Sequence, residues 1–210
     1  MDPGGGYRPK RGDVMVNDVT RQRAVVLVGP GDEQGDRLCV HLTLQPRGAV
    51  APEHRHPQIE ERLRVLAGRL ALRIGGQETE LGPGDEAVVP AGAWHESWNA
   101  GDTPAQVIQD IEPGQRFSHM AATAWGLANA GETDDKGMPS LLQLALMARE
   151  FSDVLVVRMP PVALQRALFA VLAPIARVRG LRGRYPERFE AAHEREEPDP
   201  ALLDYVSTRA

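Results

Sequence analysis

Residues 48–68 read GAVAPEHRHPQIEERLRVLAG, and residues 84–99 read GDEAVVPAGAWHESWN. Successive side chains of a strand point to opposite faces, so His54 and His56, two residues apart, can point the same way. Glu61 follows a short turn, and a returning strand would bring its carboxylate opposite those two imidazoles. His95 follows the tight bend of Pro-Ala-Gly in the second stretch. Three imidazoles and one carboxylate on a rigid sheet predict a binding site for a first-row transition metal.

The two stretches resemble the paired motifs of the cupins, G(x)5HxH(x)4E(x)6G and G(x)5PxG(x)2H(x)3N. They agree with these motifs at every fixed position, and residues 69–83 separate them. The resemblance implies a mainly β fold, the double-stranded β-helix or jelly-roll barrel of the cupins, here with an α-helical C-terminal extension.

The resemblance also implies that His54, His56, Glu61 and His95 are metal ligands. The expected cofactor is one divalent transition metal, which can be Fe, Mn, Ni, Co, Cu or Zn. The alternative is a barrel that has kept these residues but binds nothing. This alternative is disfavoured because a buried cluster of His and Glu is costly to maintain without a ligand.

Three regions are expected along the 210 residues. Residues 1–22 are rich in Gly, Pro and charge and predict a loose leader that becomes ordered near Val14. Residues 23–116 predict the barrel, and residues 117–210 a helical extension that packs on the barrel or on a partner subunit.

Strand alternation also indicates which residues line the barrel. If Glu61 points inward, so do Leu63 and Val65, and Ser97 falls on the same side as His95. His41 lies on the strand predicted for residues 38–44, of which either face can line the barrel. The possible cavity-lining residues are therefore His41, Leu63, Val65 and Ser97. Trp94 and Trp98 fall on the outer face and need cover, either from another subunit or from the chain's own C-terminal part.

The extension carries two clear helix signals. Ser140 is a plausible N-cap for a helix over residues 141–150, and Pro161 suits the first turn of a helix over residues 162–179. Residues 162–176 have almost no polar side chains, which predicts burial and, with the outward tryptophans, a homodimer. The alternative is a basic helix on an anionic membrane surface. Burial is favoured because no separate polar face is present.

Composition indicates which kind of partner and which cellular compartment to expect. The net charge of −5 argues against a nucleic-acid partner, and Cys39, the only cysteine, excludes an intramolecular disulfide. The N-terminus lacks the apolar core of a signal peptide, and no apolar run approaches the ~20 residues that span a bilayer. The sequence predicts a cytoplasmic protein whose partner is a small molecule.

The predicted function is a mononuclear metalloenzyme, a dioxygenase-type oxidoreductase that acts on a small oxygenated organic molecule. Its catalytic residues beyond the metal ligands are not predicted. The alternatives are a metal-dependent lyase or isomerase, and a non-catalytic module that binds or senses a small molecule. Metal-independent sugar epimerisation is disfavoured because it uses a His/Tyr pair, and Tyr7, Tyr185 and Tyr205 all lie outside the predicted barrel.

Overall fold

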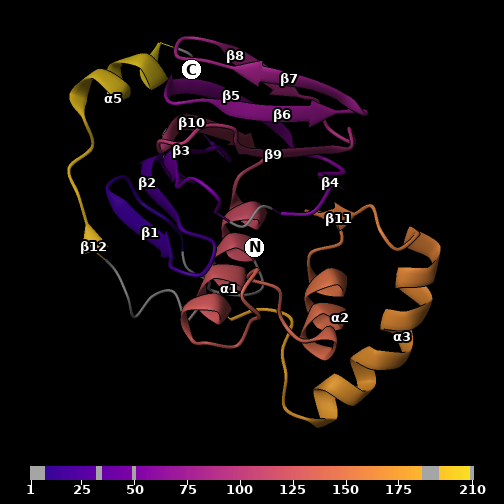
Figure 1. The fold of residues 1–210 in the computed structure, drawn as a ribbon. Coiled ribbons are helices and arrows are strands. Elements are labelled where there is room, and N and C mark those ends of the chain that lie inside the picture. Colours follow the sequence, from indigo (N-terminus) through magenta and orange to yellow (C-terminus); the bar gives the residue numbers. More distant parts are fainter. Residues whose placement is uncertain (1–7, 32–34, 49–50, 186–193, 209–210) are drawn as a thin grey trace.

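In the computed structural model, two antiparallel sheets stack face to face, and three helices lie together beside them (Figure 1). The structure describes residues 8–31, 35–48, 51–185 and 194–208, so the first seven residues of the expected leader lie outside it. The mainly β fold with a helical extension agrees with the sequence prediction.

The larger sheet has the strand order β12-β1-β2-β3-β10-β5-β8. Its strands are β1 (Asp13–Asn17), β2 (Gln22–Val28), β3 (Leu38–Leu44), β5 (Glu60–Ala67), β8 (Glu86–Val89), β10 (Ala105–Glu112) and β12 (Glu194–Arg195). Residues 14–17 of β1 pair with β2, so strand structure begins close to Val14, where the leader is expected to become ordered.

The smaller sheet has the order β11-β4-β9-β6-β7. Its strands are β4 (His54–Arg55), β6 (Leu70–Ile74), β7 (Gln77–Leu81), β9 (His95–Asn99) and β11 (Val156–Val157). Strands β6 and β7 form a hairpin whose turn is Gly75-Gly76. Both glycines have positive φ, 57° and 88°, which a tight two-residue turn requires.

The main hydrophobic core lies between the two sheets. Val40, Leu63 and Val107 reach it from the larger sheet, and Leu70 and Leu72 from the smaller one. These residues occupy alternate positions on their strands, as side chains that share one face of a sheet must. Burial of this shared apolar surface is the main force that holds the two sheets together.

Helix α1 (Gln115–Asn129) directly follows β10 and fastens the extension to the larger sheet. Its Ala122 and Leu127 belong to the main core, and the side-chain amide of Asn129 donates to the carbonyl of Val16 at 2.7 Å. Helix α2 (Leu141–Glu150) begins at Ser140, whose hydroxyl accepts from the backbone N–H of Gln143. The predicted N-cap is therefore confirmed.

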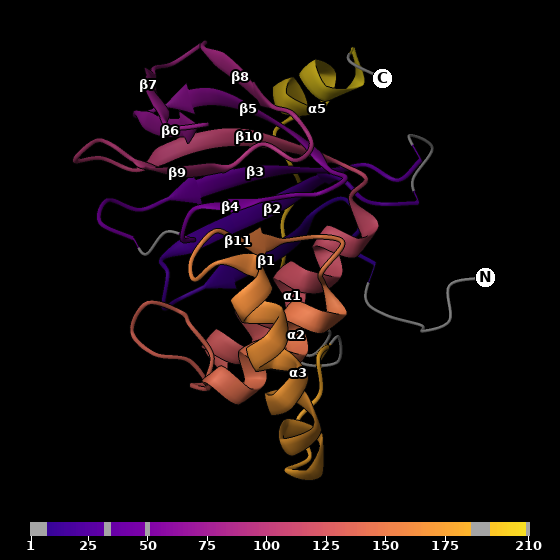
Figure 2. The same cartoon turned by 90° about the vertical axis from the view of Figure 1, so that its right-hand side faces the viewer.

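Helix α3 (Val162–Val178) packs against α2 and lies on the outside of the helical layer (Figure 2). The expectation that this helix is buried is wrong for the single chain. Five large apolar side chains of α3 are between 37% and 90% exposed: Leu164, Leu168, Val171, Ile175 and Val178. An apolar composition shows that a helix needs a partner, but it does not show whether the same chain supplies one. None of the described helices is long and apolar enough to cross a membrane.

The end of the chain returns to the larger sheet. Strand β12 pairs with β1, and helix α5 (Pro200–Ser207) places Val206 in a second apolar cluster with Leu27, Cys39 and Ile108. This cluster covers the face of the sheet that points away from the main core. The extension is thus not a separate unit, because part of it completes the sheet of the barrel.

Candidate metal centre

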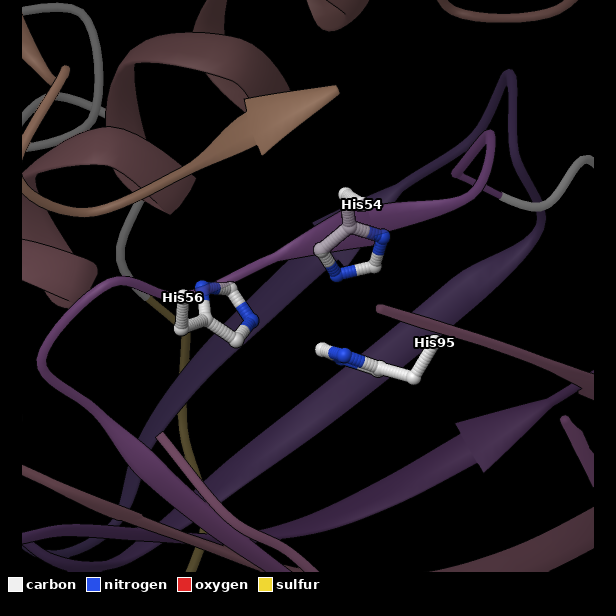
Figure 3. Close-up of side chains that lie close together, drawn as sticks. All are labelled: His54, His56 and His95. Atoms are coloured by element: carbon white, nitrogen blue, oxygen red, sulfur yellow. The ribbon is translucent and has the colours of Figure 1, made fainter. Parts of the chain in front are cut away.

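Three histidines meet between the two sheets (Figure 3). His54 lies on β4, His56 directly follows β4, and His95 is the first residue of β9. Because His54 pairs directly with His95 across these two strands, their imidazoles are fixed side by side. One ring nitrogen from each of the three residues lies within 4.8 Å of the others.

Each imidazole is oriented by a backbone carbonyl. The Nδ1 atoms of His54, His56 and His95 lie 3.0, 2.7 and 3.0 Å from the carbonyl oxygens of Pro52, Val154 and Ala93. A carbonyl oxygen can only accept a hydrogen bond, so each Nδ1 carries the hydrogen of the neutral ring. The lone pair of each ring is then on Nε2, the tautomer that binds a metal through that atom.

Glu61, on β5 of the larger sheet, lies next to the histidines. It is not in the group of three, but its Oε2 is 3.3 Å from Nε2 of His95 and 3.7 Å from Nε2 of His56. Its other oxygen, Oε1, accepts a 2.8 Å hydrogen bond from Nε2 of Gln109 on β10. The structure therefore brings together all four residues that the sequence proposed as ligands, with donors from both sheets.

The site combines three imidazoles with one charged carboxylate. Burial, together with the nearby imidazoles of His95 and His56, lowers the pKa of His54 to about 4, and burial also lowers the pKa of His56. Burial of Glu61 is outweighed by its contacts with His95, His56 and Gln109, which hold its pKa below the usual range. Burial of His95 is likewise outweighed by the Glu61 carboxylate, which raises the pKa of His95. A negative group among nitrogen donors favours a bound cation.

The residues present fit a metal ion. The Nε2 atom of His95 is buried and has no hydrogen-bond partner of acceptable geometry, although Glu61 is close. An orphaned buried polar atom is costly unless something binds it. Two ligands of one ion, each about 2.1 Å from it, lie about 3 Å apart when they meet at a right angle. The 3.3 Å between Glu61 and His95 is close to that separation.

The structure places the other proposed cavity residues in different surroundings. Leu63 and Val65 are buried on the inward face of β5 with Glu61, but they belong to the main core. Ser97 is half-buried on β9, two residues after His95, and pairs with the buried Leu72.

His41 does not line the barrel interior. Its neighbours Val40 and Leu42 point into the main core, so His41 points to the opposite face of β3. Its pKa is lowered by burial, and the charged groups that act on it include Arg23 and Glu196, which belong to the outside of the sheet. The prediction failed because strand alternation fixes two faces without showing which one is internal.

Two further residues of the site were missed. Gln109 stands between Val107 and Ile111, both in the main core, so it is a polar residue at an inward position of β10. That break in the apolar alternation is a signal that the sequence already contains. The carbonyl of Val154 has no such signal, because any residue has a carbonyl and this one lies 98 positions from His56.

Comparison with known proteins finds a similar domain in other chains. Residues 40–112 match the family model of the cupin domain. The chain is 31% identical over 97 residues to gentisate 1,2 dioxygenase 1 of Aquipseudomonas alcaligenes, a match that covers 44% of this chain and 28% of that protein. It is 34% identical over 73 residues to the tetracenomycin polyketide synthase protein TcmJ of Streptomyces glaucescens, covering 35% of this chain and 48% of that protein.

Both matches span less than half the length of those relatives. Among solved structures, KdgF from Halomonas sp. is similar with 20% identity and a TM-score of 0.39, over 47% of this chain and 84% of that one. The chain contains a cupin domain, followed by a helical C-terminal extension.

Proposed function

We propose that this protein binds one divalent transition metal through His54, His56, His95 and Glu61, and that the centre is a dioxygenase-type oxidoreductase. The observation that supports metal binding most strongly is the orientation of the three imidazole rings. Each Nδ1 is held by a carbonyl, so three Nε2 lone pairs converge at one buried point. Nitrogen and carboxylate donors together suit the first-row metals Fe, Mn, Ni, Co, Cu and Zn.

The proposed reaction class is supported by the donor set and by one relative. A metal in this site would supply a Lewis acid that stabilises negative charge on the oxygen atoms of a bound molecule. The similarity to a gentisate dioxygenase favours dioxygen as the second reactant, although that match covers only 28% of the relative. The proposed substrate is a small oxygenated organic molecule.

The chain's own residues have defined parts in this proposal. In their neutral form the three imidazoles hold their Nε2 lone pairs toward one another. Glu61 supplies the negative charge, and Gln109 fixes the orientation of its carboxylate. Leu63 and Val65 exclude water from the barrel below the site, which strengthens every electrostatic interaction within it.

A metal-dependent lyase or isomerase, and a non-catalytic module that binds or senses a small molecule, would use the same four ligands. Oxygen consumption separates them from the dioxygenase. The protein is to be reconstituted with each candidate metal and screened for oxygen uptake with small phenolic, enolic and carboxylic compounds. His56→Ala removes one ligand, and His41→Ala, on the outer face of the sheet, is the matched control.

Oxygen uptake that needs both metal and His56, and that His41→Ala retains, is the result expected. Turnover without oxygen consumption would replace the dioxygenase with a lyase or isomerase. Saturable small-molecule binding with no turnover would replace it with a binding module.

A further inference from the structure

The connection between α2 and α3 runs directly beside β4, the strand that carries His54 (Figure 1). Strand β11 pairs with β4, with Val157 opposite His54 and Val156 opposite Arg55. One residue further on, the backbone N–H of Arg158 donates to the carbonyl of Glu53 at 2.8 Å, and its guanidinium binds the Glu53 carboxylate at 2.6 Å. Strand β4 therefore has β9 on one side and a piece of the extension on the other.

The same segment also contacts the side chain of His56. The carbonyl of Val154 accepts from Nδ1 of His56 at 2.7 Å, the shortest of the three carbonyl contacts to the histidines. Both residues are almost fully buried, so water has little access to either group. His54 and His95 are oriented by carbonyls two residues away in their own loops, whereas His56 depends on the extension.

The position of Val154 is itself fixed by helix α1. The guanidinium of Arg116 donates to both carboxylate oxygens of Asp153, at 3.0 and 2.9 Å, and to the carbonyl of Glu150 at 2.6 Å. The backbone N–H of Val154 donates to the carbonyl of Phe151 at 2.9 Å. A bidentate arginine contact is directional, so it holds Asp153, the residue next to Val154, in place.

Three contacts to the rings of Phe117 and Trp94 strengthen this arrangement. The ring of Phe117, next to Arg116 on α1, lies edge-on to His56 with centroids 5.6 Å apart. Trp94 has the guanidinium of Arg55 5.0 Å from its ring and that of Arg158 5.7 Å from it. The cover expected for Trp94 thus comes partly from the chain's own extension.

We propose that residues 153–158 are a positioning element of the metal centre, which fixes the tautomer and orientation of His56 before a metal binds. This inference rests on the proposed metal centre and adds to it that the extension is needed for the site to be complete. A ligand held ready in the right tautomer loses less freedom on binding, and residues that orient metal ligands affect metal affinity by about 10- to 100-fold.

Arg116→Gln tests the proposal in the full-length protein, because it removes the guanidinium that fixes Asp153 and Glu150. Asp153→Asn keeps the shape of the Asp153 side chain but removes its charge. It is a second, milder variant for use if the first does not fold. The matched control is Arg69→Gln, which breaks an exposed ion pair with Glu80 on the β6–β7 hairpin.

Two measurements separate positioning from simple packing. The first is Co²⁺ affinity, measured by competition with a chelator. The second is the Nδ1–H signal of His56 in NMR spectra of metal-free protein labelled with ¹⁵N-histidine. We expect Arg116→Gln to weaken Co²⁺ binding by about tenfold or more and to increase the solvent exchange of that signal. Arg69→Gln should leave both unchanged.

A variant that only lowers the unfolding temperature, with Co²⁺ affinity and the His56 signal as in wild type, would overturn the inference. If wild-type protein bound no metal at all, the proposed function would fail. The NMR measurement would still test whether the extension orients His56, since it is made without metal.

Discussion

Gln109 on β10 donates from Nε2 to Oε1 of Glu61 on β5, at 2.8 Å, and so leaves Oε2 turned toward His56 and His95. The two strands are neighbours in the larger sheet, with Glu61 paired to Ile111, two residues beyond Gln109. The amide therefore sets which carboxylate oxygen faces the histidines.

Replacing Gln109 by Leu should weaken metal binding by about tenfold, because the carboxylate loses the donor that orients it. The measurement is Zn²⁺ affinity by chelator competition. The control is Gln106→Leu on the same strand, because the side chain of Gln106 interacts with His41 on the outer face of the sheet. Equal affinities for wild type and Gln109→Leu would show that Glu61 needs no such support.

Metal affinity should fall as the pH falls. A protonated imidazole has no lone pair for a metal, and the pKa of His95 is raised by Glu61, so this ring begins to take up a proton at a higher pH than an ordinary histidine. Below that pKa one proton must be displaced, and affinity drops by about tenfold per pH unit. His54, with a pKa of about 4, stays neutral through this range.

Zn²⁺ titrations at pH 7.5, 6.5 and 5.5 measure this dependence. A constant affinity across the three values would mean that His95 is not a ligand.

The thiol of Cys39 should be inert in the folded protein. Burial raises its pKa to about 12, and it is fully covered, in the cluster that contains Val206 of α5. The thiolate that reacts with disulfide reagents is therefore almost absent at pH 8. We expect no labelling by such a reagent until denaturant unfolds the chain. Rapid labelling of the native protein would show that α5 does not cover this face.

We propose that a second copy of the chain covers helix α3. Leu164, Leu168, Val171, Ile175 and Val178 follow one another at intervals of four and three residues, which places them in one stripe as in paired helices. The adjoining exposed row contains Ala163, Ala167 and Ala170, small residues that let another helix approach closely. Arg166 and Arg177 fall on a different side of the helix, and they are its two basic residues, whereas the polar face of a basic membrane anchor is rich in Lys and Arg.

Sedimentation velocity should give a dimer for wild type and a monomer for Leu168→Glu, while Arg177→Gln stays dimeric. A wild-type monomer would contradict the dimer. Salt-sensitive co-sedimentation with anionic vesicles, lost in Arg177→Gln, would favour the membrane surface instead.

The sequence was most informative where spacing along the chain decides the structure. The spacing of His54, His56, Glu61 and His95 predicted a cluster that the structure forms, and alternation from Glu61 placed Leu63 and Val65 inward. It was less informative for contacts between distant segments. Neither the carbonyl of Val154 on His56 nor the pairing of β12 with β1 follows from any local pattern, because both depend on how the extension folds back.

Metal content per chain, measured on protein purified without chelators, tests the central claim most directly. We expect about one Fe, Mn, Ni, Co, Cu or Zn ion per chain in wild type and in His41→Ala, and a sharp loss in His56→Ala with the β-rich circular dichroism spectrum retained. Wild-type protein that binds none of these six metals, either as purified or after reconstitution, would contradict the account.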